Sequence, residues 1–221
     1  MTTPLPIDLD DLLNFLVPLL NTASPTGFSE RAIALCEERF ARFGPTWRTN
    51  KGALVLTLKG VADDQPRAVT AHVDTLGAMV KDIKPNGRLK LTKLGGYAWN
   101  TIEGEGCTVF THGGAQIRGS VLLTQASSHI FGAATGDAKR DDDALEVRLD
   151  ARTRSADETR ALGIGVGDIV ALDPRVELGD AGFLRSRHLD DKAAVACVYA
   201  ALTALERAGQ PLAQRTTIHI S

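Results

Sequence analysis

The feature that most constrains the fold of this chain is a change of periodicity in its middle. Up to about residue 77, and again after Asp190, apolar residues at helical spacing alternate with short β-branched runs. Between Gly77 and Pro174 the pattern consists instead of short strands and turns. This order predicts an α/β fold in which a split α/β domain carries an inserted all-β domain of the PDZ or barrel type.

We place the α/β domain at residues 1–77 and 178–221 and the inserted β domain at residues 78–177. The helices and strands expected in the α/β domain are Leu9–Leu20, Glu30–Phe43, Ala53–Leu58, Ala68–Val73, Ala193–Leu205 and Thr216–Ile220. The last of these strands reaches the end of the chain, so we expect this domain to be incomplete at its C-terminus.

Local signals refine this outline. Pro18 is expected to end or kink the first helix because proline has no N–H to donate. A turn through Asp63 and Pro66 is expected to separate the first two strands. In the inserted domain, residues 85–87 (Pro-Asn-Gly) predict a hairpin turn, and the polar stretch 127–143 predicts a mobile loop.

Composition argues against several classes of function. Hydrophobic residues make up 43% of the chain, enough for a sizeable core, whereas the net charge of -2 and the 5% of aromatic residues argue against a nucleic-acid partner. Asp8, Asp10 and Asp11 give the N-terminus the wrong charge for a signal peptide, and no apolar run is long enough for a bilayer. Three scattered cysteines indicate a reducing compartment, so we expect a cytoplasmic protein with no membrane partner.

The first chemically informative pair is His72 and Asp74, at the end of an expected strand. Residues two apart in a strand project to the same side, and open α/β sheets bind ligands at the carboxyl ends of their strands. A neutral imidazole could bind a divalent metal while the carboxylate fixes its orientation. Alternatively, the two side chains simply hydrogen-bond to each other, and the pair by itself is a weak signal.

The second pair is Asp190 and Asp191, directly before the alanine-rich helix. Carboxylates at a helix N-terminus often do no more than cap the helix and complement its dipole. The functional alternative is a carboxylate that bridges two cations, one on each oxygen. His188 lies two residues before Asp190 and is either a group that supports the site or a surface histidine.

Two other features point away from different chemistries. The glycine-rich stretch 163–167 precedes an expected strand and not a helix, so it does not meet the context of a dinucleotide-binding loop. Cys197 lies on the apolar face of an expected helix and is predicted to be a core residue. No cysteine has a plausible base beside it, which argues against cysteine catalysis.

Taken together, the two pairs and their surroundings resemble peptidase family M42, the glutamyl aminopeptidase and TET-like peptidases. The matching segments follow the family order along essentially the whole chain: 24–28 (SPTGF), 72–80 (HVDTLGAMV), 163–168 (GIGVGD) and 188–193 (HLDDKA). The amino-acid sequence around 72–80 and 186–192 is most similar to that of the M42-like peptidases of bacterial N-acetylglutaminylglutamine amide osmoprotectant systems.

The resemblance implies a zinc-peptidase-like α/β domain and a role for each residue of the two pairs. His72 resembles a metal ligand, catalytic Asp74 the carboxylate that orients it, and Asp190 the ligand that bridges two metals. Asp191 and His188 would not bind the metals themselves but would hold the ligands in place. Lys192 stands where the family usually has arginine. Lysine keeps the positive charge but lacks the planar guanidinium group, whose donors can bind two oxygens side by side.

The resemblance also implies a cofactor and a mechanism. Two divalent ions, zinc or cobalt, would lower the pKa of a shared water and polarise the scissile carbonyl. A glutamate would pass the proton of that water to the leaving amine. The substrate would be a peptide with a free N-terminus, and the intact protein would be a homo-oligomer.

In the family, a Glu-Glu pair, a further Asp and a late His follow the strand that is expected here at 216–220. The chain ends at Ser221, so we expect a C-terminally truncated chain that is inactive alone and binds metal weakly. Two alternatives remain. One is an amidohydrolase or deacylase acting on a small N-acyl peptide such as an osmoprotectant dipeptide. The other is an inactive truncated paralogue with a structural role.

Overall fold

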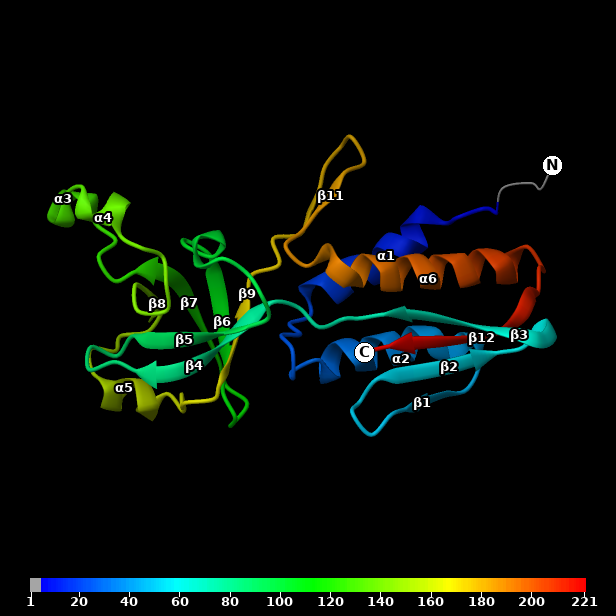
Figure 1. Cartoon of the computed structure of the whole chain (residues 1–221), viewed down its shortest axis with the longest axis horizontal. Helices are drawn as coiled ribbons and strands as arrows, with labels where there is room; N and C mark the ends of the chain where they lie inside the picture. Colours follow the sequence, from blue (N-terminus) through cyan, green and yellow to red (C-terminus); the bar gives the residue numbers. More distant parts are fainter. Residues whose placement is uncertain (1–4) are drawn as a thin grey trace. The chain divides into compact units, whose positions relative to one another are not determined.

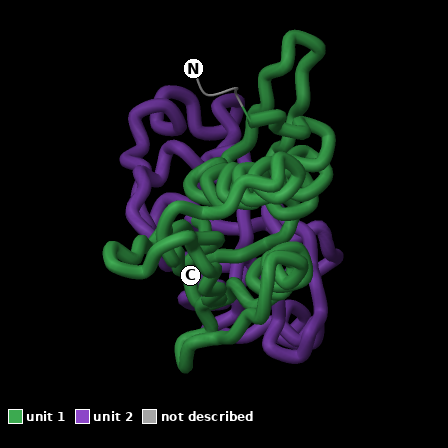
Figure 2. The backbone as a smooth tube through the Cα atoms, turned by 90° about the vertical axis from the view of Figure 1, so that its right-hand side faces the viewer, with its two compact units in different colours: residues 1–75, 174–221 green, residues 76–173 purple. Residues whose placement is uncertain are grey.

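The computed structural model describes residues 5–221 and divides into two compact units (Figure 2). Unit 1 consists of the described residues up to Thr75 together with Pro174–Ser221, and unit 2 consists of Leu76–Asp173. The chain enters and leaves unit 2 once, so unit 2 is an insertion within unit 1. The predicted fold class, a split α/β domain with an inserted β domain, is confirmed.

Unit 1 is built on a mixed four-stranded sheet (Figure 1). In spatial order its strands are β1 (Thr46–Arg48), β2 (Leu54–Leu58), β12 (Leu212–Ile220) and β3 (Gly60–Ala71). β12 pairs antiparallel with β2 and parallel with β3. A small hairpin of β10 (Glu177–Leu178) and β11 (Leu184–Arg185) precedes the last helix.

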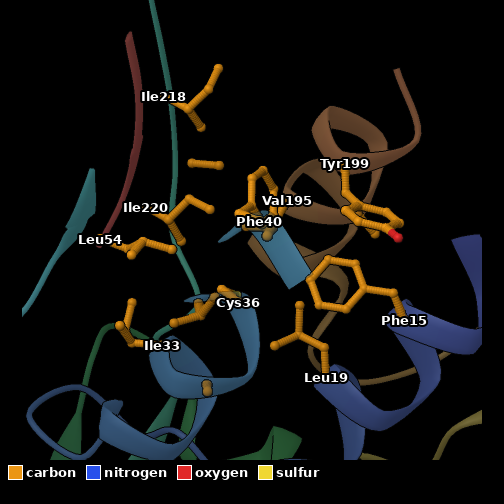
Figure 3. Close-up of a cluster of buried hydrophobic side chains, with 14 of the residues drawn as sticks. Phe15, Leu19, Ile33, Cys36, Phe40, Leu54, Val195, Tyr199, Ile218 and Ile220 are labelled. Atoms are coloured by element: carbon orange, nitrogen blue, oxygen red, sulfur yellow. The ribbon is translucent and has the colours of Figure 1, made fainter. Parts of the chain in front are cut away.

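Three helices and the sheet of unit 1 share one hydrophobic core (Figure 3). The helices are α1 (Leu9–Asn21), α2 (Glu30–Phe40), which continues as the short 3-10 helix η1 (Ala41–Phe43), and α6 (Leu189–Arg207). The buried side chains include Phe15, Leu19, Ile33, Cys36, Phe40, Leu54, Val195, Tyr199, Ile218 and Ile220. Each large apolar side chain buried here contributes about 1.5–3 kcal/mol, so this core fixes the helices on the sheet.

α1 continues past Pro18 to Asn21, so of the two expected effects of Pro18, an end or a kink, the end of the helix does not occur. A proline at this position leaves the carbonyl of Asn14 without its usual helical donor. Arg39 of α2 replaces that donor, because its Nη2 donates to the Asn14 carbonyl at 3.0 Å. A side chain from the neighbouring helix thus compensates for the proline.

β3 runs as one strand, so the turn expected through Asp63 and Pro66 is also wrong. The pairing of β3 with β12 shifts register between Gln214 and Thr216, and residues 63–66 lie at this irregularity. Pro66 has no N–H for the ladder, and a bulge on an edge strand accommodates a residue of that kind.

Unit 2 is a closed barrel. Around the barrel its strands are β4 (Gly77–Ile83), β5 (Leu89–Leu94), β8 (Leu145–Leu149), β7 (Gln116–Leu123), β6 (Gly106–Phe110) and β9 (Ile169–Leu172). Residues 85–87 form the turn between β4 and β5, as predicted. Closure leaves no unpaired sheet edge, and the inward side chains of the strands form a second core.

Unit 2 also contains short helices that the sequence pattern did not predict. The stretch expected to be a mobile loop carries α3 (Ser128–Phe131) and α4 (Ala134–Asp137). The others are the 3-10 helix η2 (Trp99–Thr101) and α5 (Ala156–Ala161). Helices of this length are too short to show a 3.6-residue periodicity.

The glycine-rich stretch before β9 is a structural turn. Asp168 is buried, and its carboxylate accepts hydrogen bonds from the backbone N–H groups of Gly165 (2.8 Å) and His112 (2.9 Å). It thereby ties the turn between β6 and β7 to the entry of β9. Within residues 5–221, no helix combines the length and the apolar character that crossing a bilayer requires.

Lys192, in the first turn of α6, is fully buried. Its Nζ donates to the carbonyl oxygens of Leu19 (2.9 Å) and Thr22 (2.7 Å), at the C-terminal end of α1. The last carbonyls of a helix lack the donors of a further helical turn, and although Leu19 O also accepts from the backbone N–H of Thr22 at 3.2 Å, the lysine supplies a donor to both carbonyls. It thereby joins the end of α1 to the start of α6. Burial lowers the pKa of Lys192 from 10.5 to about 8.

This pKa predicts how the stability of the chain changes with pH. Between pH 8 and 10.5 the unfolded chain keeps a proton on Lys192 that the folded chain has lost, so stability should rise with pH in this window. The free energy of unfolding of the wild type should gain up to about 3 kcal/mol relative to Lys192→Met. Urea unfolding of both proteins at several pH values measures this difference. A difference that stays level, as expected for the exposed control Lys59→Met, would contradict the assignment.

The three cysteines differ in accessibility. Cys36 and Cys107 are buried, and burial raises the pKa of each thiol to about 12. Cys197 is exposed, so its predicted place in the core is wrong. It lies on α6 between Ala196 and Val198, but it faces away from the helix side on which Val195 and Tyr199 pack.

We therefore expect one of the three thiols to react rapidly with Ellman's reagent in the native chain, because a thiol must be accessible and ionised to react. All three should react in denaturant. Cys197→Ser should remove the rapid phase and leave unfolding unchanged. Rapid native labelling of two or more thiols would show that a core cysteine is accessible.

Candidate metal centre

The candidate site lies at the carboxyl end of β3. The ladder between β3 and β12 continues beyond both strands, because Val73 N donates to Ser221 O at 2.8 Å and Ser221 N donates to Ala71 O at 3.1 Å. His72 and Asp74 stand on this extension of β3. They therefore lie where two parallel strands end together, at the edge of the sheet that binds ligands in open α/β folds.

His72 and Asp74 contact each other, as their alternation along the strand predicts. His72 Nδ1 lies 2.8 Å from Asp74 Oδ1 and 3.1 Å from the Asp74 carbonyl oxygen. With a proton on Nδ1, the ring donates to these oxygens and leaves the lone pair of Nε2 directed outward.

The second part of the site is the start of α6. His188 is the N-cap residue, and the backbone of Asp190 and Asp191 is not yet helical; the peptide bond between these two residues is cis. α6 is the crossover helix between the parallel strands β3 and β12, so it begins at the end of the sheet where both strands finish (Figure 1). This topology brings Asp190 close to His72, although the whole of unit 2 separates the two residues in the sequence.

His72 Nε2 lies 3.3 Å from Asp190 Oδ1. Two atoms that each bind one tetrahedral zinc ion at about 2.0–2.1 Å are about 3.3–3.4 Å apart, so the spacing fits a shared cation. The Asp190 side chain is 95% exposed, which leaves its second oxygen accessible from solvent. A bridging carboxylate needs this accessibility, because each of its oxygens must reach an ion.

The two residues predicted to support the ligands have different surroundings. Asp191 Oδ2 accepts a hydrogen bond of 3.4 Å from the backbone N–H of His72, so it links the start of α6 to the end of β3. His188 is buried, with 6% of its surface exposed, and its backbone N–H donates to Ser186 Oγ at 3.2 Å. The alternative of a surface histidine at position 188 is therefore wrong.

The charge of the site favours a cation. Asp74, Asp190 and Asp191 all contact His72. The nearby Lys192 does not neutralise them, because its ammonium donates to the carbonyls at the end of α1. Two carboxylates at the imidazole and a third at the backbone N–H of His72 create a negative potential that attracts divalent ions or an ammonium group.

The sequence interpretation missed one residue of this site. Thr26 was not among the candidate site residues, but its hydroxyl donates to Asp74 Oδ2 at 2.6 Å. The segment 24–28 belongs to the pattern that resembles family M42, and this was the available signal. Within residues 5–221, no group of three or more His, Cys, Asp or Glu side chains is arranged to hold a metal ion by itself.

The fold is that of TET-type aminopeptidases. A solved TET aminopeptidase from Thaumarchaeota archaeon SCGC AB-539-E09 superimposes with a TM-score of 0.86 at 19% identity, over 96% of this chain and 58% of that one. The Pyrococcus horikoshii TET1 peptidase superimposes with a TM-score of 0.78 at 18% identity, over 95% of this chain and 60% of that one. At these identities the likeness concerns the fold alone.

Sequence comparison gives the family. The family described as M42 glutamyl aminopeptidase matches residues 52–220, and the chain therefore belongs to peptidase family M42. YhfE of Bacillus subtilis (strain 168), provisionally named as an aminopeptidase, is 46% identical over 179 residues, which cover 80% of this chain and 51% of YhfE. The chain thus spans about half the length of this curated relative, and the predicted resemblance to M42 is confirmed.

The residues that hold the strand end allow a test. Ser24 is buried, and its Oγ donates to the Val73 carbonyl at 2.7 Å. Ser24→Ala leaves this buried carbonyl without its donor, so the free energy of unfolding should fall by about 1–2 kcal/mol in urea titrations. Ser29→Ala is the matched control, because Ser29 makes no capping hydrogen bond at the start of α2. Equal effects of the two substitutions would contradict the role given to Ser24.

Proposed function

We propose that this chain contributes part of the two-metal site of an M42 aminopeptidase. His72 would be the imidazole ligand of one ion, Asp190 the carboxylate shared by both ions, and Asp74 the group that orients His72. The observation that carries the proposal is the distance of 3.3 Å between His72 Nε2 and Asp190 Oδ1. The two residues belong to segments that precede and follow unit 2 in the sequence.

The donor atoms favour zinc or cobalt, because an imidazole together with carboxylates suits these ions and no thiolate takes part. Bound ions would supply an activated water and polarisation of the scissile carbonyl. The chain's own residues would hold and orient the ligands. Asp74 keeps the Nδ1 proton of His72 in place, and Asp191 joins the two backbone segments that carry the ligands.

The proposed substrate is a peptide with a free N-terminus. The carboxylates around His72 would attract an α-ammonium group, whereas an N-acyl group has no charge to offer. The family description and the name of YhfE also favour an aminopeptidase over a deacylase. Because the chain spans about half of its relative, activity and substrate belong to the proposal for the whole protein.

Assembly is a further part of the proposal. The Pyrococcus horikoshii TET1 peptidase is described as assembling into a tetrahedron or a large octahedral shell. We extend this tendency to the present protein as a homo-oligomer of unspecified size.

Metal binding tests the proposal directly. We expect calorimetric titration with zinc chloride to show weak binding to the wild-type chain, because the described residues provide few ligands. His72→Ala and Asp190→Asn should each weaken binding at least about tenfold, since each removes a proposed ligand. His129→Ala and Asp180→Asn are matched controls at exposed positions outside the proposed ligand set. Affinity that is unchanged in both site variants would refute the proposal.

A substrate panel separates the rival functions. Peptides with free N-termini and N-acyl dipeptides would be offered to the chain with zinc or cobalt and again with a chelator. We expect this chain to be inactive, since its described residues include no group of three or more metal-ligating side chains. Chelator-sensitive cleavage of the free peptides would contradict that expectation yet support the aminopeptidase. Cleavage confined to the N-acyl substrates would favour the deacylase, and an absence of metal binding would favour a structural paralogue.

A further inference from the structure

The segment that holds Thr26 is fixed to the end of β3 by its backbone. Thr75 N donates to the Ser24 carbonyl at 2.8 Å, and Thr26 N donates to the Thr75 carbonyl at 3.2 Å. Pro25 forms a parallel bridge with Thr75 between these two bonds. Together with the buried bond from Ser24 Oγ to the Val73 carbonyl, these contacts give residue 26 a defined place beside the site.

Both oxygens of the Asp74 carboxylate are engaged. Oδ1 contacts His72 Nδ1 at 2.8 Å, and Oδ2 accepts from the Thr26 hydroxyl at 2.6 Å. Thr26, Asp74, His72 and Asp190 thus form a continuous series of contacts from the turn to the candidate metal position.

We propose that Thr26 is a positioning residue for the metal site, acting through Asp74 on the ring of His72. The inference rests on the proposed function, because it concerns how the proposed imidazole ligand is oriented. Thr26 does not reach the metal position itself. Its hydroxyl fixes which way the carboxylate of Asp74 faces, and the carboxylate in turn fixes the ring.

The physical reason is the freedom of a partly exposed carboxylate. About a third of the Asp74 side chain is exposed, so a carboxylate held at one oxygen only could turn toward water. A donor at each oxygen fixes its plane, and a fixed plane keeps the Nδ1–H of His72 as the donor. The lone pair of Nε2 then remains directed toward the candidate metal position that Asp190 Oδ1 would share.

Thr26→Val tests this role because valine keeps the branched shape and removes the hydroxyl. Thr26→Ser keeps the donor, and Thr57→Val removes an exposed hydroxyl from the same sheet, away from the site. The first readout is the tautomer of His72 in the metal-free chain, from long-range proton–nitrogen spectra. The second readout is the zinc affinity from calorimetry with zinc chloride.

We expect Thr26→Val to change the nitrogen shifts of His72 toward a mixture of tautomers and to weaken zinc binding about tenfold. Thr26→Ser and Thr57→Val should behave like the wild type. The unfolding midpoint of Thr26→Val should stay near that of Thr57→Val, since the backbone bonds of residue 26 remain. If the valine variant does not fold, Thr26→Ala provides the same two readouts.

The outcomes separate this inference from the proposed function. Unchanged His72 signals and unchanged zinc affinity in Thr26→Val would overturn the role of Thr26, even if zinc still depended on His72 and Asp190. A wild-type chain that binds no zinc, but whose His72 tautomer changes in Thr26→Val, would support the positioning contact and refute the metal site. A loss of zinc affinity that serine does not restore would also overturn the inference.

Discussion

The parallel pairing of β3 with β12 is the constraint on which the rest of unit 1 depends. Parallel neighbours need a crossover, here α6, and a crossover helix must begin where the first strand ends. This requirement places the start of α6 beside His72 and lets unit 2 be inserted between β3 and α6 without separating them. The closeness of His72 and Asp190 is therefore a consequence of topology.

The sequence predicted features that depend on local spacing. Apolar periodicity predicted the core helices, and the two-residue spacing of His72 and Asp74 predicted that they share one side of the strand end. It did not predict features that depend on distant partners. The support of α1 by Arg39 and the contact of Thr26 with Asp74 join residues far apart in the chain, and no local pattern encodes such a pairing. The exposure of Cys197 likewise depends on which side of α6 meets the core.

The charges around the site are separated in a way that suits cation binding. The single buried ammonium, within the described chain, belongs to Lys192 and is directed at the backbone carbonyls of α1, whereas the carboxylates collect around His72. One positive group thus stabilises the scaffold without cancelling the negative potential of the site. An ammonium directed at Asp190 would compete with any metal for the same oxygens.

The bond between Val73 N and Ser221 O has a practical consequence for work with this chain. A peptide attached after Ser221 starts beside the end of β3 that carries His72. A polyhistidine purification tag at that end would add its own imidazoles next to the candidate centre and would imitate or mask the coordination proposed for His72 and Asp190. An affinity tag belongs instead at the other terminus, and metal titrations of a C-terminally tagged protein would report on the tag.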